Sequence, residues 1–280
     1  MCTTGSSTGT AADPAMPCAE LDERRIYYEL HGAGEPVLLV SGLAADHTAW
    51  ALQSEYLRQF FQVLVFDNPG VGQTTGPRGP YTTALFADVA AALLRSLGIG
   101  RAHVVGASMG GMIAQQLAVR QPSLVRSLVL HCSWWRADRY TRALVRSWQA
   151  FARAAGMLEL QRQIWLWVFT PRFFEERPDD VAGLERQAIE NPHPQSVEAF
   201  CDQAEACIAH DALEQVREIA VPTLITVGDR DILSPPAHSQ ALRERIRGST
   251  LHVWKDMGHA PFWEIPDDFN RLNHEFLEAH

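Results

Sequence analysis

The chain reads Ala102-His103-Val104-Val105-Gly106-Ala107-Ser108-Met109-Gly110, and residues 112–119 after it have the composition of a helix. An apolar strand, then the pattern G-x-S-x-G, then a helix is the setting in which this motif presents a serine as a nucleophile. The pattern alone is common, so the strand before it and the helix after it make the prediction specific. We therefore predict that Ser108 is a nucleophile on a turn between a buried strand and a helix.

Two glycines are expected to make this turn possible. On a tight, strained turn, side chains two residues before and two residues after the serine would collide with neighbouring backbone, which explains Gly106 and Gly110. The amide of Met109 begins the predicted helix. It is therefore expected to face a negative charge that develops on an oxygen bound at Ser108.

The composition sets the broad class of the protein. With 280 residues, 46% hydrophobic and 20% charged, the chain can form one large α/β domain or two modest ones. The formal net charge of −9 argues against partners such as nucleic acid or an anionic membrane, so we expect a small-molecule substrate. Lys255 is the only lysine, which suggests the codon usage of a bacterial source. Whether the protein is a monomer or a homodimer stays open.

The N-terminal residues are small and polar, and we predict a disordered tail over 1–18. The first ten residues lack the positive charge and the apolar core of a signal peptide, so a cytoplasmic location is expected. The cysteines are Cys2, Cys18, Cys132, Cys201 and Cys207. Their number is odd and none forms a C-x-x-C pair, which argues against a disulfide framework and against a zinc site.

Short apolar runs alternate with helix-like stretches along most of the chain. The predicted strands are 37–40, 63–66, 102–105, 128–130, 223–227 and 251–254, with 26–28 as a hairpin strand before a turn at 32–34. With a helix predicted over 84–97, this alternation favours an α/β fold with a mostly parallel, twisted sheet flanked by helices. The interval 133–218 is helical throughout and too long for a simple connection. We predict that it is an inserted helical cap, here called the cap segment, between core parts 19–132 and 219–280.

A serine nucleophile needs a base, and the base needs an orienting carboxylate. After a strand–elbow–helix unit the acid and then the histidine are expected, each on a loop that follows a strand. Asp231 and Asp229 both follow a predicted strand, and Asp231 is preferred because the turn needs a few residues to bring a carboxylate back over the edge of the sheet. His259 follows the last predicted strand, and Gly258 before it is expected to free the loop.

Position separates His259 from other histidines in the sequence. His103 and His252 fall within predicted strands, while His47, His131 and His238 fall on loops or strand ends at the wrong place in the order. The second oxyanion donor is expected from the loop after strand 37–40, where the amide of Leu43 is the candidate.

These motifs together resemble the α/β-hydrolase superfamily. The resemblance rests on 41–43 with Trp50, 66–72, 106–111, 228–231 with Pro235, and 258–259, in the order of that superfamily from about residue 20 to the C-terminus. The sequence is most similar to the 3-oxoadipate enol-lactonases and to the carbamate hydrolase of bacterial pyrimidine breakdown. Those relatives share the Gly-Leu loop with a tryptophan after it, and a cap opening like 133–136.

The resemblance implies roles for particular residues. It makes Ser108 the nucleophile, Asp231 the acid and His259 the base, with the amides of Leu43 and Met109 as oxyanion donors. It also implies that the fold is an α/β-hydrolase fold with an inserted helical cap, and that neither a cofactor nor a metal is needed.

Three positions narrow the range of reactions. Ser41 replaces a histidine that many members carry before the glycine, which leaves the backbone donor intact. Members that hydrolyse haloalkanes or epoxides use an aspartate nucleophile, so Ser108 argues against those reactions. Hydrolases of carbon–carbon bonds in aromatic ring cleavage often carry asparagine before the serine, and Ala107 weakens that alternative.

The cap segment is rich in aromatic and arginine side chains. The aromatic residues Trp134, Trp135, Trp165, Trp167, Phe169, Phe173 and Phe174 could line an apolar substrate pocket or simply pack the helices. Leu144, Trp148, Phe151 and Ala155 repeat at helical spacing and are predicted to form a buried stripe. The arginines could attract an anionic substrate or form a solvated helix face. The candidate substrate-binding residues are Trp135, Arg136 and Trp165.

We therefore expect a serine hydrolase that cleaves a small ester, lactone or carbamate-like compound through an acyl-enzyme. One alternative is another reaction on the same three residues, namely carbon–carbon bond hydrolysis or cofactor-free perhydrolase chemistry. The other is a ligand receptor of the same fold that turns over negligibly. The sequence does not distinguish between an ester, a lactone and a carbamate as the natural substrate.

Overall fold

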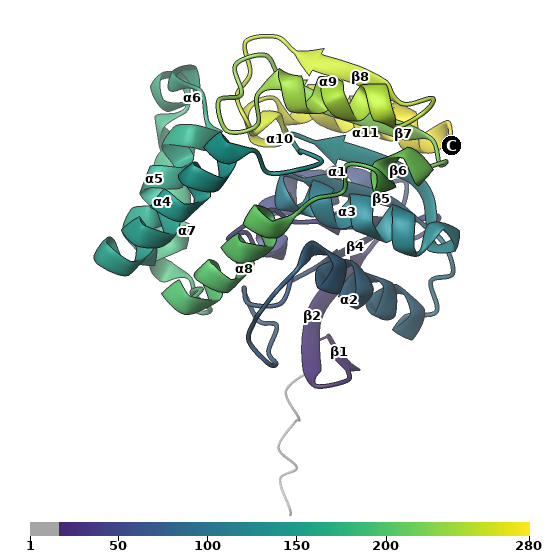
Figure 1. Ribbon diagram of the computed structural model, residues 1–280, viewed down its shortest axis with the longest axis horizontal. Coiled ribbons are helices and arrows are strands. Elements are labelled where there is room, and N and C mark those ends of the chain that lie inside the picture. The colour runs from purple at the N-terminus through teal and green to yellow at the C-terminus, as the bar shows by residue number, and fades with distance from the viewer. Residues whose placement is uncertain (1–16) are drawn as a thin grey trace, which may run out of the picture.

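A central sheet organises the structure, a computed structural model that describes residues 17–280 (Figure 1). The strands are β1 (Cys18–Leu21), β2 (Arg24–His31), β3 (Pro36–Val40), β4 (Gln62–Phe66), β5 (Ala102–Ala107), β6 (Val125–His131), β7 (Thr223–Gly228) and β8 (Thr250–Trp254). Their order in the sheet is β1-β2-β4-β3-β5-β6-β7-β8. β2 is antiparallel to β1 and β4, while β4, β3 and β5 to β8 pair in parallel. The predicted α/β fold with a mostly parallel sheet is confirmed.

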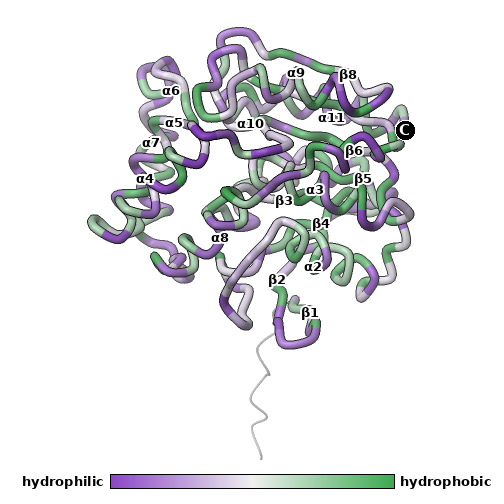
Figure 2. Tube along the Cα trace, in the orientation of Figure 1, coloured by the Kyte–Doolittle hydropathy of each residue, from purple (hydrophilic) through white to green (hydrophobic). Residues whose placement is uncertain are grey.

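Helices cover both faces of this sheet. The core helices are α1 (Ala51–Leu57), α2 (Thr83–Ser96), α3 (Met109–Arg120), α9 (Pro236–Arg245), α10 (Pro261–Glu264) and α11 (Pro266–Glu278). In β3, Leu38 and Val40 belong to the core cluster under α2 and α3, whereas Val37 and Leu39 belong to the cluster under α1 and α11. Strands buried on both faces read as continuous apolar runs, and Figure 2 shows the central strands in hydrophobic colours.

Each predicted strand lies within an observed one. The burial of β5 explains why its apolar run predicted a strand. All six residues of β5 are buried, and burying one valine side chain contributes about 1.5–3 kcal/mol. The sequence pattern did not separate β1 from β2, which meet at a turn after Leu21 and pair through Cys18 and Tyr27. Cys18 therefore begins a strand, whereas most of the tail predicted over 1–18 lies outside the described residues.

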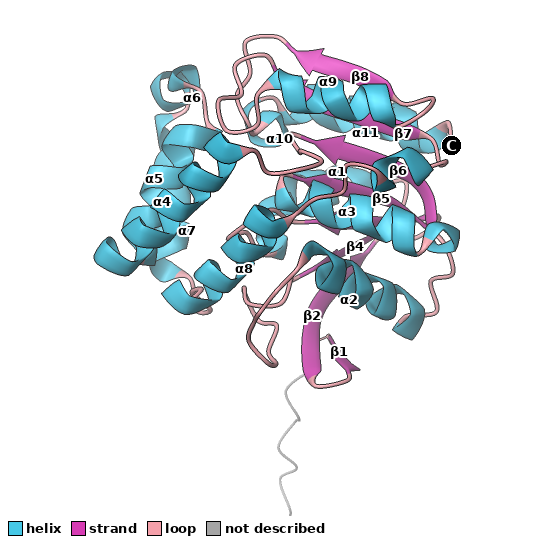
Figure 3. Cartoon of the chain, viewed as in Figure 1, coloured by secondary structure: helices cyan, strands magenta, loops and turns pink. Residues whose placement is uncertain are grey.

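The cap segment joins β6 to β7. It contains α4 (Arg139–Ala155), α5 (Met157–Val168), α6 (Pro171–Glu176), α7 (Pro178–Glu190) and α8 (Val197–Ala209), followed by a short 3-10 turn at Gln215–Glu218. These helices gather at one side of the sheet, on the left in Figure 3. None of the helices in the described part of the chain, residues 17–280, has the length and apolar character needed to cross a membrane.

The buried face of α4 differs from the predicted stripe. Leu144 and Trp148 are buried as expected, but Phe151 is 36% exposed and Ala155 is also exposed, so the prediction was wrong for these two. The buried face is instead rotated toward Val145, Gln149 and Ala152. Gln149 donates a hydrogen bond to the carbonyl oxygen of Cys201 on α8. A hydrophobic pattern cannot reveal a buried face that includes a hydrogen-bonded glutamine.

Candidate active site

Ser108 lies on the sharp turn between β5 and α3. Its backbone has φ 56° and ψ −119°, a conformation that few residues with a side chain adopt. Neighbouring strands hold it there, because the amide of Ser108 donates to the carbonyl oxygen of His131 at 2.9 Å. The hydroxyl of Ser133 donates to the carbonyl oxygen of Ser108, also at 2.9 Å. A strained residue fixed in this way is typical of a functional site.

The two glycines beside Ser108 are required by close backbone contacts. A Cβ atom at Gly106 would lie 2.3 Å from the carbonyl oxygen of Gly110, and a Cβ atom at Gly110 would lie 2.0 Å from the carbonyl oxygen of Val40. Both distances are far inside van der Waals contact. The collisions expected from the sequence are therefore real, and they involve backbone atoms that cannot move aside.

Asp231 and His259 meet on the loops that follow β7 and β8. The Nδ1 atom of His259 lies 2.8 Å from Oδ2 of Asp231, and both residues are buried. The other carboxylate oxygen, Oδ1, accepts hydrogen bonds from the amides of Leu233 and Ser234. Asp229, the competing carboxylate, is exposed. The carboxylate of Asp231 thus fixes the imidazole and leaves Nε2 of His259 as the ring nitrogen that can take a proton.

A second potential nucleophile, Cys132, lies beside this pair. The Sγ atom of Cys132 lies within 4.8 Å of ligand atoms of both Asp231 and His259. The residue is fully buried and has φ 48°. Burial raises the pKa of the Cys132 thiol well above its ordinary value, and the charge of Asp231 raises it further. The thiol therefore stays protonated and unreactive, which leaves Ser108 as the candidate nucleophile.

The loop that carries Leu43 lies against Ser108. A Cβ atom at Gly42 would lie 3.4 Å from Cβ and 4.0 Å from Oγ of Ser108. Within residues 17–280, the amide of Leu43 donates no hydrogen bond. Met109 is the first residue of α3, where amides lack acceptors within the helix. The two amides predicted as oxyanion donors thus have no acceptor from their own loop or helix, as such a role requires.

A buried glutamine of the cap segment supports this loop and was missed in the sequence. Gln203 on α8 accepts a hydrogen bond from the amide of Ala44 at 3.3 Å and donates to the carbonyl oxygen of Pro69 at 2.8 Å. It is fully buried, between Phe200 and Cys207 on the apolar face of the helix. A polar residue within that apolar stripe is the signal that could have identified it.

The turn after β4 also holds loop 41–47 in place through hydrogen bonds. Asp67 is fully buried, and its Oδ1 atom accepts from the backbone amide of His47 at 2.8 Å and lies 2.7 Å from Nδ1 of its ring. Burial alone would lower the pKa of His47, but the hydrogen bond to Asp67 and the nearby carboxylates raise it overall. The side chain of Asn68 also donates to the carbonyl oxygen of Ser41. The conformation of loop 41–47 is therefore determined by the neighbouring turn.

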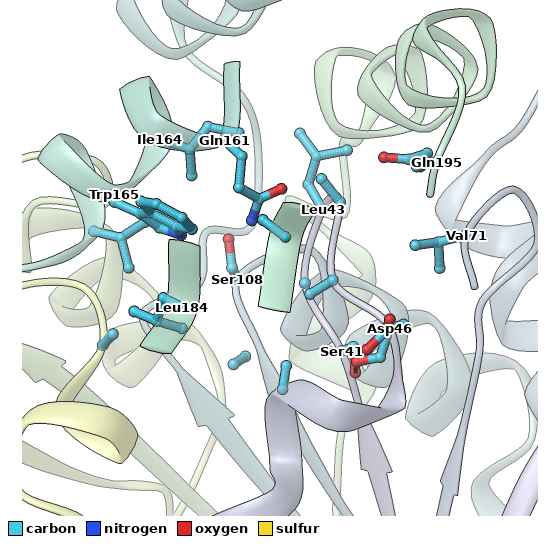
Figure 4. A pocket seen from close by; sticks show the side chains of 18 of the residues that line it. Ser41, Leu43, Asp46, Val71, Ser108, Gln161, Ile164, Trp165, Leu184 and Gln195 are labelled. Atoms are coloured by element: carbon cyan, nitrogen blue, oxygen red, sulfur yellow. Dashed lines mark hydrogen bonds between the residues drawn. The ribbon is translucent and has the colours of Figure 1, made fainter. Parts of the chain in front are cut away.

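Ser108 and His259 both border one cavity of about 330 Å³ between the sheet and the cap segment (Figure 4). Trp165 lines this cavity, as do Leu43 and Leu184. Trp135 and Arg136 do not lie among the lining residues. The guanidinium groups of Arg136 and Arg245 instead lie over the ring of Trp135, at 4.6 and 4.8 Å from the ring centroid.

Two clusters of potential metal ligands occur within the described part of the chain. They are Cys132 with Asp231 and His259, and Asp46 with His47 and Asp67. In each cluster a histidine already lies within hydrogen-bonding distance of a carboxylate. These contacts account for both clusters as protein hydrogen-bond networks.

Comparison with known proteins shows which protein family the chain belongs to. Residues 35–266 match the family described as alpha/beta hydrolase fold. The chain therefore belongs to the α/β-hydrolase family of enzymes. The expected superfamily is thereby confirmed.

Individual members of this family are similar to the chain in sequence and in structure. The chain is 31% identical to a protein of Azorhizobium caulinodans named "Putative carbamate hydrolase RutD", over 92% of this chain and 96% of that one. It is 30% identical to 3-oxoadipate enol-lactonase 2 of Acinetobacter baylyi, over 85% of this chain and 87% of that one. The crystal structure of the enol-lactonase from Burkholderia xenovorans LB400 superposes with a TM-score of 0.86 at 26% identity, covering 94% and 100% of the two chains.

Proposed function

We propose that this protein is a serine hydrolase that cleaves a small ester, lactone or carbamate-like substrate through an acyl-enzyme. The observation that carries the proposal is the convergence on one cavity of a serine on a strained turn and a buried histidine–carboxylate pair. In this proposal the core, 19–132 and 219–280, supplies the reacting groups, and the cap segment closes the cavity above them.

The chemistry follows from the roles that the geometry allows. Nε2 of His259 takes the proton of Ser108 while the serine oxygen attacks the substrate carbonyl, and Asp231 stabilises the imidazolium that forms. The amides of Leu43 and Met109 bind the oxyanion. The protonated His259 then gives its proton to the leaving oxygen or nitrogen as the bond to the carbonyl carbon breaks.

Hydrolysis of the acyl-enzyme reverses these roles. A water molecule gives its proton to His259 and attacks the acyl carbon, and Ser108 leaves with that proton. Each oxyanion donor in such a site contributes about 3 kcal/mol to the stability of the transition state. Loop 41–47 therefore matters as much as the three side chains, and its buried supports have a functional reason.

The test is covalent labelling of the purified protein with a fluorophosphonate, followed by intact mass and peptide mapping. We expect a single adduct on Ser108 that disappears in Ser108→Ala and in His259→Ala. Ser123→Ala, which alters an exposed serine, is the matched control and should label normally. A folded protein that gives no adduct would refute an activated serine and favour a ligand-binding protein of this fold.

Product analysis separates reactions that share the same three residues. A panel of esters, lactones and β-diketones should yield an acid and an alcohol from the esters, a ring-opened acid from the lactones, and no carbon–carbon cleavage from the β-diketones. Cleavage of a β-diketone faster than of any ester would overturn the proposed substrate class.

A further inference from the structure

The walls of the cavity carry almost no charge. Most lining residues are apolar, and the only carboxylate and imidazole side chains among the described lining residues are those of Asp46, His193 and His259. Among the described residues that line the cavity there is no arginine and no lysine. Asp46 is itself engaged, because its carboxylate accepts hydrogen bonds from the amide and the hydroxyl of Thr48.

The arginines of the cap segment lie elsewhere. On α4 they are exposed to solvent, namely Arg139, Arg142, Arg146 and Arg153. Arg162 on α5 pairs with Glu159 and Glu185. A carboxylate in the cavity would therefore lose its hydration without gaining a cation, which is strongly unfavourable in an apolar site.

Four of the polar side chains that line the cavity are carboxamides, and three of the four are already bonded. Gln187 donates to the hydroxyl of Thr48, and Gln195 donates to the carbonyl oxygen of Gly70. The side-chain oxygen of Asn191 accepts a hydrogen bond from the amide of His193. These side chains hold neighbouring segments in place and are not free to bind a substrate with the bonded atoms.

Gln161 differs from the other three. It extends from α5 into the cavity (Figure 4), and its carboxamide makes no hydrogen bond with any of the described residues. A free carboxamide offers two donors and one acceptor oxygen without net charge. It is therefore suited to bind an uncharged polar group such as an amide or a carbonyl.

We propose that the cavity selects uncharged acyl substrates and that Gln161 binds a second polar, uncharged group on them, while the apolar walls contact their hydrocarbon part. Esters and lactones that carry a carboxylate are poor substrates. This inference rests on the proposed serine hydrolase activity and specifies its substrate class.

Three p-nitrophenyl esters with acyl chains of equal length test the selection. They are the pentanoate, which is apolar, the N-acetylglycinate, which carries an amide, and the hydrogen glutarate, which carries a carboxylate. Ser108→Ala provides the background rate for each ester. We expect kcat/KM for both uncharged esters to exceed that for the glutarate ester by about 100-fold.

Two substitutions at Gln161 test its role. Gln161→Leu keeps the size and should lower kcat/KM for the N-acetylglycinate about tenfold more than kcat/KM for the pentanoate. Gln161→Arg supplies a cation and should raise kcat/KM for the glutarate ester about tenfold.

The outcomes distinguish this inference from the proposed function. A wild-type enzyme that labels at Ser108 but cleaves the glutarate ester as fast as the pentanoate would overturn the inference alone. An equal loss of kcat/KM on both uncharged esters in Gln161→Leu would likewise show that Gln161 does not bind the second polar group. Absence of labelling at Ser108 would instead refute the serine hydrolase itself.

Discussion

The backbone amide of His259 donates a hydrogen bond to the carbonyl oxygen of Val168, the last residue of α5, at 2.9 Å. The candidate general base and the helix that carries Gln161 are thus joined directly. Glu264 reinforces this junction, since its carboxylate accepts from the amide and the hydroxyl of Thr170. A Cβ atom at Gly258 would lie 2.9 Å from the same Val168 oxygen, so this glycine is explained by close approach to the cap segment.

Removing the carboxylate of Glu264 should slow the reaction. Glu264→Ala loses both hydrogen bonds to Thr170, so we expect kcat to fall about tenfold through misplacement of the loop that carries His259. Glu264→Gln keeps one acceptor oxygen and should retain more activity than the alanine variant. Steady-state kinetics on one ester measures both, and equal activity of Glu264→Ala and wild type would show that the junction is not needed.

The same residue predicts a pH effect on stability. Burial raises the pKa of Glu264 above its ordinary value of 4.5, with the hydrogen bonds from Thr170 opposing. A raised pKa in the folded state means that its contribution to stability is present below pH 4.5 and is lost as pH rises through the folded-state value. As pH rises from about 4 to 7, the free energy of unfolding of wild type should therefore fall relative to that of Glu264→Gln. Urea unfolding at several pH values checks the sign.

A methyl group at the serine turn should be poorly tolerated. In Gly110→Ala the new Cβ atom would lie 2.0 Å from the carbonyl oxygen of Val40, and we expect a loss of about 3 kcal/mol or more in the free energy of unfolding. Gly183→Ala is the matched control within α7, where the new Cβ atom would lie 3.8 Å from the Arg186 side chain and meet nothing closer outside the backbone of its own helix. That variant should gain up to about 1 kcal/mol. Similar stabilities in urea unfolding would contradict the close-contact argument.

Gln203 should affect the transition state more than substrate binding. Gln203→Leu removes the hydrogen bonds to Ala44 and Pro69, so we expect kcat to fall about tenfold with little change in KM. Gln240→Leu, at an exposed position on α9, is the control and should behave as wild type. A rise in KM with unchanged kcat would show that Gln203 shapes the cavity and not the oxyanion loop.

The buried thiols should resist alkylation in the native protein. Burial raises the pKa of Cys207 to about 12 and that of Cys132 well above its ordinary value. Treatment with iodoacetamide at about pH 8 should therefore modify the partly exposed Cys18 and spare Cys132 and Cys207 until the protein is unfolded. Peptide mapping before and after denaturation decides this, and labelling of native Cys132 would mean that a reactive thiol lies beside the histidine.

The sequence predicted those features that depend on local pattern. Apolar runs located the central strands because a strand buried on both faces has few polar positions. The order of the motifs identified Asp231 and His259 as the candidate acid and base. Positions that depend on how helices pack were not predictable in this way. Trp135 and Trp165 look equivalent in the sequence, yet only Trp165 lines the cavity. Gln161 and Gln203 are polar residues whose importance depends on which face of α5 and α8 meets the core.

The attachment of the cap segment to two neighbouring strands has an evolutionary consequence. β6 and β7 pair directly and in parallel, with His131 opposite Thr226, so the chain leaves the sheet at the C-terminal end of β6 and rejoins it at the N-terminal end of the neighbouring strand β7. Doubling the length of such an insertion costs only about 0.6 kcal/mol in closure entropy, and it disturbs no strand pairing. Descendants of this chain can therefore exchange most of residues 133–218 and acquire new specificities while inheriting the reacting groups unchanged. The anchoring contacts of Val168 and Gln203 are the ones that such a lineage would have to preserve.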